Sequence, residues 1–115
     1  MRRGEVRLTD LDPPRGSEAD KRRPAIIVSN DRANAAAARL GRGVVTVVPV
    51  TSNVSRVFAF QVLLPAESSG LRVDSKARCE QARSVAVQRP GPMLGRLPAT
   101  VMSRIDDALR LHLGL

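Results

Sequence analysis

Three short segments of the sequence concentrate side chains that could act on a phosphodiester. They are residues 22–24 (RRP), 49–53 (PVTSN) and 78–83 (RCEQAR). Arginine presents a planar fork of donors that matches phosphate oxygens, whereas carboxylates and hydroxyls can accept or orient a proton. Metal-free cleavage of a phosphodiester needs a base, a proton donor for the leaving oxygen, and positive charge on the phosphorane.

The first segment places Arg23 directly before Pro24. Proline restrains the preceding residue to extended backbone, so we expect Arg23 at the rigid start of a buried strand. A guanidinium mounted there could bind a phosphate. The alternative is a solvated run of charge.

The second and third segments supply hydroxyl and acidic groups. Thr51 and the two residues after it follow a predicted buried strand, where they form either part of a site or an ordinary turn. In the third segment, strand alternation predicts that Arg78, Glu80 and Ala82 share one face. Arg78 and Glu80 are then either an ion pair, or a phosphate clamp beside a proton acceptor.

Histidine and cysteine are too few to supply the more usual acid–base or metal chemistry. The single histidine, His112, falls in the last turn of a predicted helix, where we expect a surface or cap residue. The single cysteine, Cys79, excludes an intramolecular disulfide and gives no zinc-ligand spacing. Metal-free chemistry on this chain must therefore use Arg, Glu, Asp, Thr or Ser.

The composition predicts one small basic domain that spans residues 1–115. The 115 residues are 43% hydrophobic and 26% charged, which is ordinary for a globular protein and too short for two separate cores. The formal net charge of +8 favours polyanionic partners; a membrane surface is disfavoured because no basic helix with bulky apolar anchors is evident. No apolar stretch indicates a signal peptide or a transmembrane helix, so the cytoplasm is the expected compartment.

The hydrophobic pattern predicts a mainly β fold with one C-terminal helix. Strands are predicted at 5–9, 25–29, 44–50, about 57–64, 71–78 and roughly 80–87. A helical period predicts a helix over 99–113, with Pro98 near its first turn and Gly114 at its end. This order is typical of a small curled antiparallel sheet or barrel with a helix packed on it.

Position-specific expectations follow for two of these strands. In the first, Glu5, Arg7 and Thr9 are expected on the exposed side. In the fourth, four apolar side chains are expected on one face; they are Phe58, Phe60, Val62 and Leu64.

The remaining segments are predicted as connections. They comprise a long charged loop at 12–23, a loop with a single helical turn at 30–43, a turn at 51–56 and a Gly/Pro-rich link at 91–98. Pro49 suggests a sheet edge or a bulge, because proline cannot donate to a strand ladder.

Segments along nearly the whole chain match one family in order. They are RGEV at 3–6, DLDP at 10–13, RGSE at 15–18, RPAIIVSND at 23–31, VPVTS at 48–52, FQVLL at 60–64 and CEQARS at 79–84. On these motifs the chain resembles the MazF/PemK family of bacterial toxin ribonucleases. The most specific parts are the Arg-Pro pair with its apolar strand and the Pro-Val-Thr-Ser turn.

The resemblance implies a homodimer of SH3-like, CcdB-like barrels, each with a C-terminal helix. Such dimers cut single-stranded RNA at short motifs without a metal or cofactor, and leave a 2′,3′-cyclic phosphate and a 5′-OH. A cognate antitoxin of the MazE type would occupy the RNA-binding groove.

The resemblance also assigns two candidate catalytic pairs. MazF-like members use the Arg of Arg-Pro and the Thr of the turn, here Arg23 and Thr51. Kid-like members use an Arg-Cys-Asp segment, here Arg78 and Glu80. We favour Arg23 as the phosphorane stabiliser and proton donor with Thr51 in a positioning role, because an unperturbed threonine is a poor base. The second pair is the alternative.

The sequence departs from the family pattern at three positions. Arg7 stands where many members have Trp or Tyr, Ser17 where some Kid-like members have a catalytic His, and Glu80 is one methylene longer than Asp. Since the chain has no Trp or Tyr, we expect RNA to be read by loop hydrogen bonds and arginine stacking. The candidate RNA-binding residues are Arg15, Ser17, Glu18, Lys21, Ser52, Asn53, Arg56, Gln81 and Arg83.

Two other functions stay open at this point. A gyrase poison of the CcdB type would share the fold, but that activity relies on a Trp-containing tail, whereas this chain ends in HLGL. A non-catalytic RNA-binding module is the other alternative.

Overall fold

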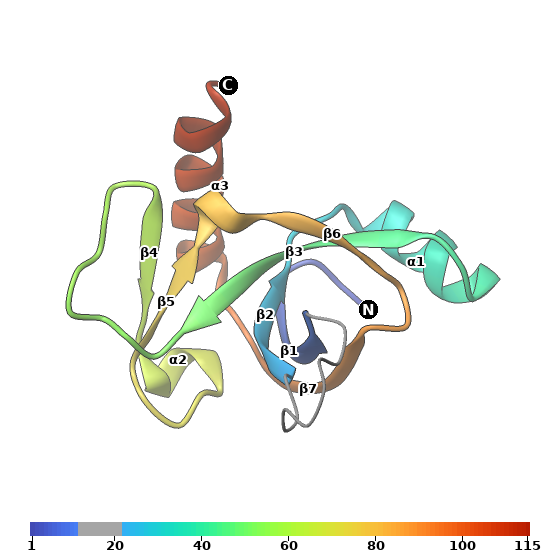
Figure 1. Ribbon diagram of the computed structural model, residues 1–115, viewed down its shortest axis with the longest axis horizontal. Helices are drawn as coiled ribbons and strands as arrows, with labels where there is room; N and C mark the ends of the chain where they lie inside the picture. Colours follow the sequence, from blue (N-terminus) through green and yellow to red (C-terminus); the bar gives the residue numbers. More distant parts are fainter. Residues whose placement is uncertain (12–21) are drawn as a thin grey trace, which may run out of the picture.

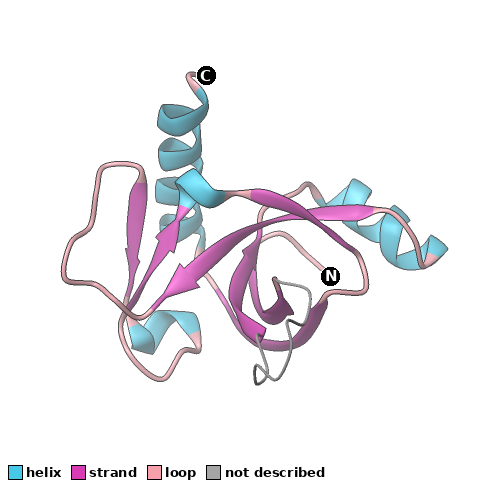
Figure 2. Cartoon of the chain, viewed as in Figure 1, coloured by secondary structure: helices cyan, strands magenta, loops and turns pink. Residues whose placement is uncertain are grey.

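A curved antiparallel sheet forms the body of the molecule (Figures 1 and 2). The computed structural model describes residues 1–11 and 22–115. Its strands are β1 (Glu5–Asp10), β2 (Arg22–Ile27), β3 (Val44–Thr51), β4 (Gln61–Leu64), β5 (Ser75–Arg78), β6 (Arg83–Ala86) and β7 (Pro90–Arg96). Its helices are α1 (Asp31–Leu40), α2 (Ala66–Ser69) and α3 (Ala99–Leu113), with a 3-10 turn, η1, at Cys79–Gln81.

The strand order is β4-β5-β3-β2-β1-β7, and β6 also pairs with β3. The recorded strand pairs are all antiparallel. The mainly β fold with a C-terminal helix is therefore confirmed, whereas these pairings do not test closure of the sheet into a barrel.

Strand β3 lies between two hydrophobic clusters. Val48 and Val50 belong to the cluster that α3 covers, whereas Val45 and Val47 belong to the other. A strand that is buried on both faces needs apolar residues at nearly every position. This explains the VVTVVPV sequence of β3. Figure 1 shows β3 crossing the molecule from the α1 side toward β4 and β5.

Pro49 lies inside the sheet, so its predicted edge position is wrong. It pairs with Ala25 of β2. On the other side of β3, the recorded pairs with β6 end at Val47 and those with β5 begin at Val50. Pro49 thus occupies a break between two partner strands, where a ladder bond is not required.

The first strand is buried more deeply than its alternation predicts. Glu5 and Thr9 are both buried, although they were expected on the exposed side with Arg7. Their polar groups have internal partners: Arg7 Nε donates to Glu5 Oε1 at 2.8 Å, and Thr9 Oγ1 donates to the Arg7 carbonyl at 2.9 Å. Strand β1 has β2 on one edge and β7 on the other, which shields these groups.

Two segments predicted as connections have regular structure. Residues 31–40 form a ten-residue helix, because Asn30 caps its first turn by accepting from Ala33 N at 2.8 Å and its alanines favour helix. Residues 90–96 form β7, in which pairing with β1 overrides the Gly/Pro composition. Prolines are tolerated there because β7 is an edge strand.

The C-terminal helix is confirmed with the predicted bounds. Pro98 is its N-cap and Gly114, at φ 73°, is its C-cap. Helix α3 packs against β4 and η1 through the buried residues Val101, Ile105 and Ala108. No helix in the described ranges is long and apolar enough to cross a membrane.

Gly95 in β7 allows the end of α2 to approach the sheet. A Cβ at Gly95 would lie 2.3 Å from the Ser69 carbonyl oxygen. We expect Gly95→Ala to destabilise the protein by about 1–3 kcal/mol, since backbone must move to accept the methyl group. Urea unfolding measures the change. The exposed helix variant Ser103→Ala should change stability by less than about 0.5 kcal/mol; equal midpoints for the two variants would contradict the close contact.

Candidate active site at the ends of β2, β3 and β5

The end of β3 brings the predicted catalytic residues to one place. Thr51, the last residue of β3, pairs with Lys76 of β5. On the opposite edge, β2 and β3 pair through Ala25 and Pro49. Continuing this register by two residues places Arg23 level with Thr51. Arg23 is exposed and Thr51 is half-buried, so both can be reached from solvent.

Strand alternation separates this polar surface from the core. Val50 and Ala77 are paired and buried in the cluster under α3. Their neighbours Thr51, Lys76 and Arg78 therefore project to the opposite face of the sheet. The apolar cluster thus fixes the orientation of the polar side chains that follow and precede it in sequence.

The predicted turn after β3 is confirmed, and hydrogen bonds hold it. Thr51 Oγ1 accepts from Asn53 N at 3.2 Å, so the hydroxyl proton stays available to a ligand. Asn53 Oδ1 accepts from Ser55 N at 3.2 Å and from Ser55 Oγ at 2.8 Å. The carbonyl oxygen of the Asn53 side chain is therefore used within the turn, and its NH₂ group remains available to donate to a ligand.

The Arg78–Glu80 segment differs from the extended strand that its alternation predicts. Cys79–Gln81 is a 3-10 turn, which begins where β5 ends. Cys79 points into the core, and Ala82 packs against that same core instead of sharing a face with Arg78 and Glu80. The turn arises because the chain must leave β5 and join β6, which starts at Arg83.

Arg78 and Glu80 each carry a buried polar atom without a partner in the described part of the chain. These atoms are Arg78 Nε, a donor, and Glu80 Oε1, an acceptor. The other carboxylate oxygen, Glu80 Oε2, accepts from Gln61 Nε2 at 2.8 Å. Buried polar groups are nearly always hydrogen-bonded, so these two atoms, on residues two apart in sequence, are exceptions within the described part of the chain.

Sequence reasoning did not identify Gln61 and Lys76 as part of this site. Gln61 is buried and pairs with Arg78 across β4 and β5. Lys76 is also buried, and its Nζ donates to the Arg56 carbonyl. A glutamine and a lysine within predicted strands were the available signal, because a polar side chain buried in a sheet needs a specific partner.

The other predicted RNA-binding residues fall into two groups, those that the structure describes and those that it does not. Arg15, Ser17, Glu18 and Lys21 lie outside the described residues. Ser52, Arg56, Gln81 and Arg83 are exposed, and Arg83 lies on β6 opposite Val47. His112 is exposed on the last turn of α3, as predicted.

Arg7, which replaces the family aromatic, makes structural contacts. Besides its bond to Glu5, its Nη1 donates to the Gly91 carbonyl at 2.8 Å. The guanidinium therefore ties β1 to β7.

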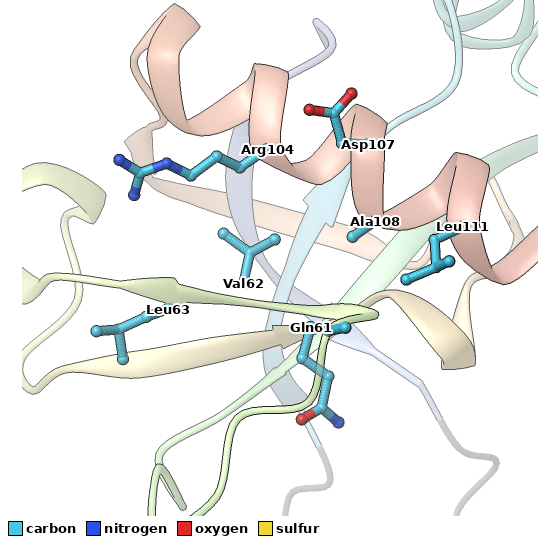
Figure 3. A pocket seen from close by; sticks show the side chains of 8 residues that line it. Gln61, Val62, Leu63, Arg104, Asp107, Ala108 and Leu111 are labelled. Carbon is cyan, nitrogen blue, oxygen red and sulfur yellow. The ribbon is translucent and has the colours of Figure 1, made fainter.

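A groove of about 340 Å³ lies between β4 and α3. Val62, Ala108 and Leu111 form its apolar walls, and Arg104 and Asp107 lie on the helix above it (Figure 3). None of the four candidate catalytic residues lines this groove. Gln61, which bonds Glu80, also lines the groove and so connects it to the polar surface at the end of β3. Within the described ranges, no three His, Cys, Asp or Glu side chains are grouped as a metal site.

The fold is a small basic domain with a mainly antiparallel sheet and a C-terminal helix. Residues 2–113 match the family described as PemK-like, MazF-like toxin of type II toxin-antitoxin system. The chain therefore belongs to this family, and it is a MazF-type toxin endoribonuclease of a toxin–antitoxin system.

Named relatives support this assignment over the full length of the chain. Endoribonuclease MazF9 of Mycobacterium tuberculosis is 60% identical, covering 100% of this chain and 98% of the relative. Endoribonuclease PemK of Escherichia coli is 39% identical, covering 91% of this chain and 76% of the relative.

Solved structures share the fold. MazF from Deinococcus radiodurans superposes with a TM-score of 0.78 at 27% identity, covering 100% of this chain and 97% of that one. An endoribonuclease in complex with its cognate antitoxin, from a mycobacterial species, gives a TM-score of 0.77 at 25% identity, covering 100% and 96% of the two chains.

The Cys79 thiol tests the packing beneath the site. Burial raises its pKa to about 12, and the negative charge of Glu80 adds to the shift. At pH 8 the folded protein should react with a thiol reagent at least about 1000-fold more slowly than the urea-unfolded chain, because the thiolate is the nucleophile. The Glu80→Gln variant loses only the smaller of the two causes of the raised pKa, the charge of Glu80. Cys79 in this variant should therefore still react slowly with the reagent. Similar rates for folded and unfolded protein would contradict a buried Cys79.

Proposed function

We propose that this toxin cuts single-stranded RNA at short sequence motifs without a metal. The ribose 2′-OH attacks the adjacent phosphorus, the bond to the 5′-oxygen breaks, and the products carry a 2′,3′-cyclic phosphate and a 5′-OH. Cutting mRNA, tRNA or rRNA in the cytoplasm would inhibit translation and growth. The observation that supports this proposal is the strand register around β3, in which Thr51 pairs with Lys76, Pro49 pairs with Ala25, and Arg78 pairs with Gln61.

Arg23 is the group that stabilises the phosphorane and donates the proton to the leaving oxygen. It is exposed at the start of a strand whose next residues, Ala25 and Ile26, are completely buried. This anchoring limits backbone motion, so the guanidinium meets the phosphate at low entropic cost. Thr51 orients the 2′-OH or a phosphate oxygen, since its hydroxyl proton is not used within the turn.

Arg78 and Glu80 provide the alternative acid–base pair. The unpartnered Nε of Arg78 suits a phosphate oxygen, and the unpartnered Oε1 of Glu80 suits the 2′-OH proton. Gln61 holds the other Glu80 oxygen and so fixes the direction in which Oε1 points. Ser52, Asn53, Arg56, Gln81 and Arg83 would contact the RNA on either side, together with Arg15, Ser17, Glu18 and Lys21.

The working molecule is proposed to be a homodimer of SH3-like barrels that an antitoxin inhibits. The antitoxin part is supported by two solved structures of this fold, an endoribonuclease bound to its cognate antitoxin and a MazE–MazF complex from Deinococcus radiodurans. An antitoxin of the MazE type would cover the RNA-binding surface of this chain.

The direct test is cleavage of a long RNA in EDTA, with the new ends mapped by primer extension. We expect discrete cuts with 5′-OH ends. Arg23→Ala should slow cleavage by about 100- to 1000-fold, because it removes a preorganised donor to the phosphorane. Arg39→Ala, which removes another exposed arginine, from α1, should cut at the wild-type rate.

The same experiment separates the alternatives. If Arg23→Ala is fully active and Glu80→Gln is inactive, the catalytic residues are the Arg78–Glu80 pair and not Arg23. RNA that is bound but never cut would contradict the proposed reaction and favour a binding module. Intact RNA with arrested supercoiling would favour the gyrase poison.

A further inference from the structure

The loop between β3 and β4 carries both aromatic residues of the chain, stacked on each other. The rings of Phe58 and Phe60 lie 5.3 Å apart between centroids, with 6° between their planes. The sequence predicts both rings within a strand, but β4 begins at Gln61, and a hydrogen bond from Gln61 N to the Phe58 carbonyl at 2.9 Å closes a turn instead. As a result Phe58 is 41% exposed.

Two cations lie over the Phe58 ring. The guanidinium carbon of Arg56 lies 5.0 Å from the Phe58 ring centroid, and Lys76 Nζ lies 6.0 Å from it. A guanidinium stacked on two parallel rings matches a nucleotide, because a base can stack on the end of such a column while the cations attract the phosphate. A net charge of +8 on the chain favours the same partner.

Hydrogen bonds connect this aromatic cluster to the candidate active site. Gln61 Oε1 accepts from Phe58 N at 3.1 Å, while Gln61 Nε2 donates to Glu80 Oε2 at 2.8 Å. Lys76, the strand partner of Thr51, donates to the Arg56 carbonyl. The cluster is therefore held at a fixed position next to Thr51 and Glu80, as a subsite for one nucleotide must be.

We propose that Arg56, Phe58 and Phe60 form a stacking platform that binds one nucleobase of the RNA close to the cleaved phosphate. The proposal rests on the proposed function, because its ligand is the RNA substrate. The platform supplies the aromatic stacking surface that a chain without Trp or Tyr otherwise lacks. Stacking tolerates every base, so it adds affinity more than sequence selectivity.

The test uses a short RNA that spans a mapped cleavage site, with a 2′-deoxy sugar at the cleaved position so that it binds without reacting. Phe58→Leu keeps an apolar side chain but removes the π face. We expect it to weaken binding by about 5- to 150-fold. Leu40→Ala, which truncates a 61% exposed side chain on α1 at the other end of the molecule, should bind as the wild type does (Figure 1).

A second variant reports contact directly. Phe58→Trp should retain affinity, and its fluorescence should change when the RNA binds, since it would be the chain's single tryptophan. Nucleotides of the RNA are then replaced one at a time by abasic residues. At one position we expect the replacement to weaken binding to the wild type but not to weaken binding to Phe58→Leu any further. Such coupling identifies the stacked base.

Two results would overturn the platform while the nuclease assignment stands. One is wild-type affinity of Phe58→Leu in an enzyme that cuts RNA. The other is a folded Phe58→Trp protein whose fluorescence does not change when RNA is added. This second result tests the platform even if Phe58→Leu unfolds. Loss of self-association without loss of RNA affinity would instead show a protein contact and reject the platform. A wild-type protein that neither binds nor cuts RNA would contradict the proposed function itself.

Discussion

The pairing of β3 with three other strands is the constraint on which the rest of the structure depends. Its buried residues alternate between two hydrophobic clusters, so a shift of one residue would exchange the two faces and place polar groups in the core. This penalty fixes the register with β2 on one edge and with β6 and β5 on the other. The strand end at Thr51 then has a fixed position relative to Arg23 and Lys76. The active-site geometry is therefore a consequence of core packing.

The polar groups around this strand end form a connected set. Lys76 and Gln61 are buried, yet each has a partner: Lys76 bonds the Arg56 carbonyl, and Gln61 joins the Phe58 backbone to the Glu80 carboxylate. Satisfied buried polar groups hold a unique arrangement, because any alternative would leave a desolvated donor or acceptor. The unpartnered atoms of Arg78 and Glu80 are the exception. The proposed RNA substrate would supply partners for these two atoms.

The sequence was a good guide to the elements with strong periodicity and a poor one where tertiary contacts decide. Helix α3 matches its predicted bounds, and the continuous apolar runs of β2 and β3 were recognised as buried strands. Residues 90–96 became a strand only through pairing with β1, which local composition does not show. Phe58 and Phe60 fitted a strand period, but the chain forms a turn that closes at Gln61, and Phe58 is exposed there. For the candidate site, motifs predicted Thr51 and Glu80, and these stay predictions, whereas Gln61 became a candidate only through its contacts in the folded chain.

The central claim is that strand register makes Arg23 and Thr51 act on the same phosphate. A double-mutant cycle with Arg23→Ala and Thr51→Val, measured as single-turnover cleavage of one RNA site in EDTA, tests this claim most directly. Residues that act as a unit lose their effects together, so the double variant should be about as slow as the slower single variant. If the two rate reductions instead multiply independently, the two side chains act separately and the account is contradicted.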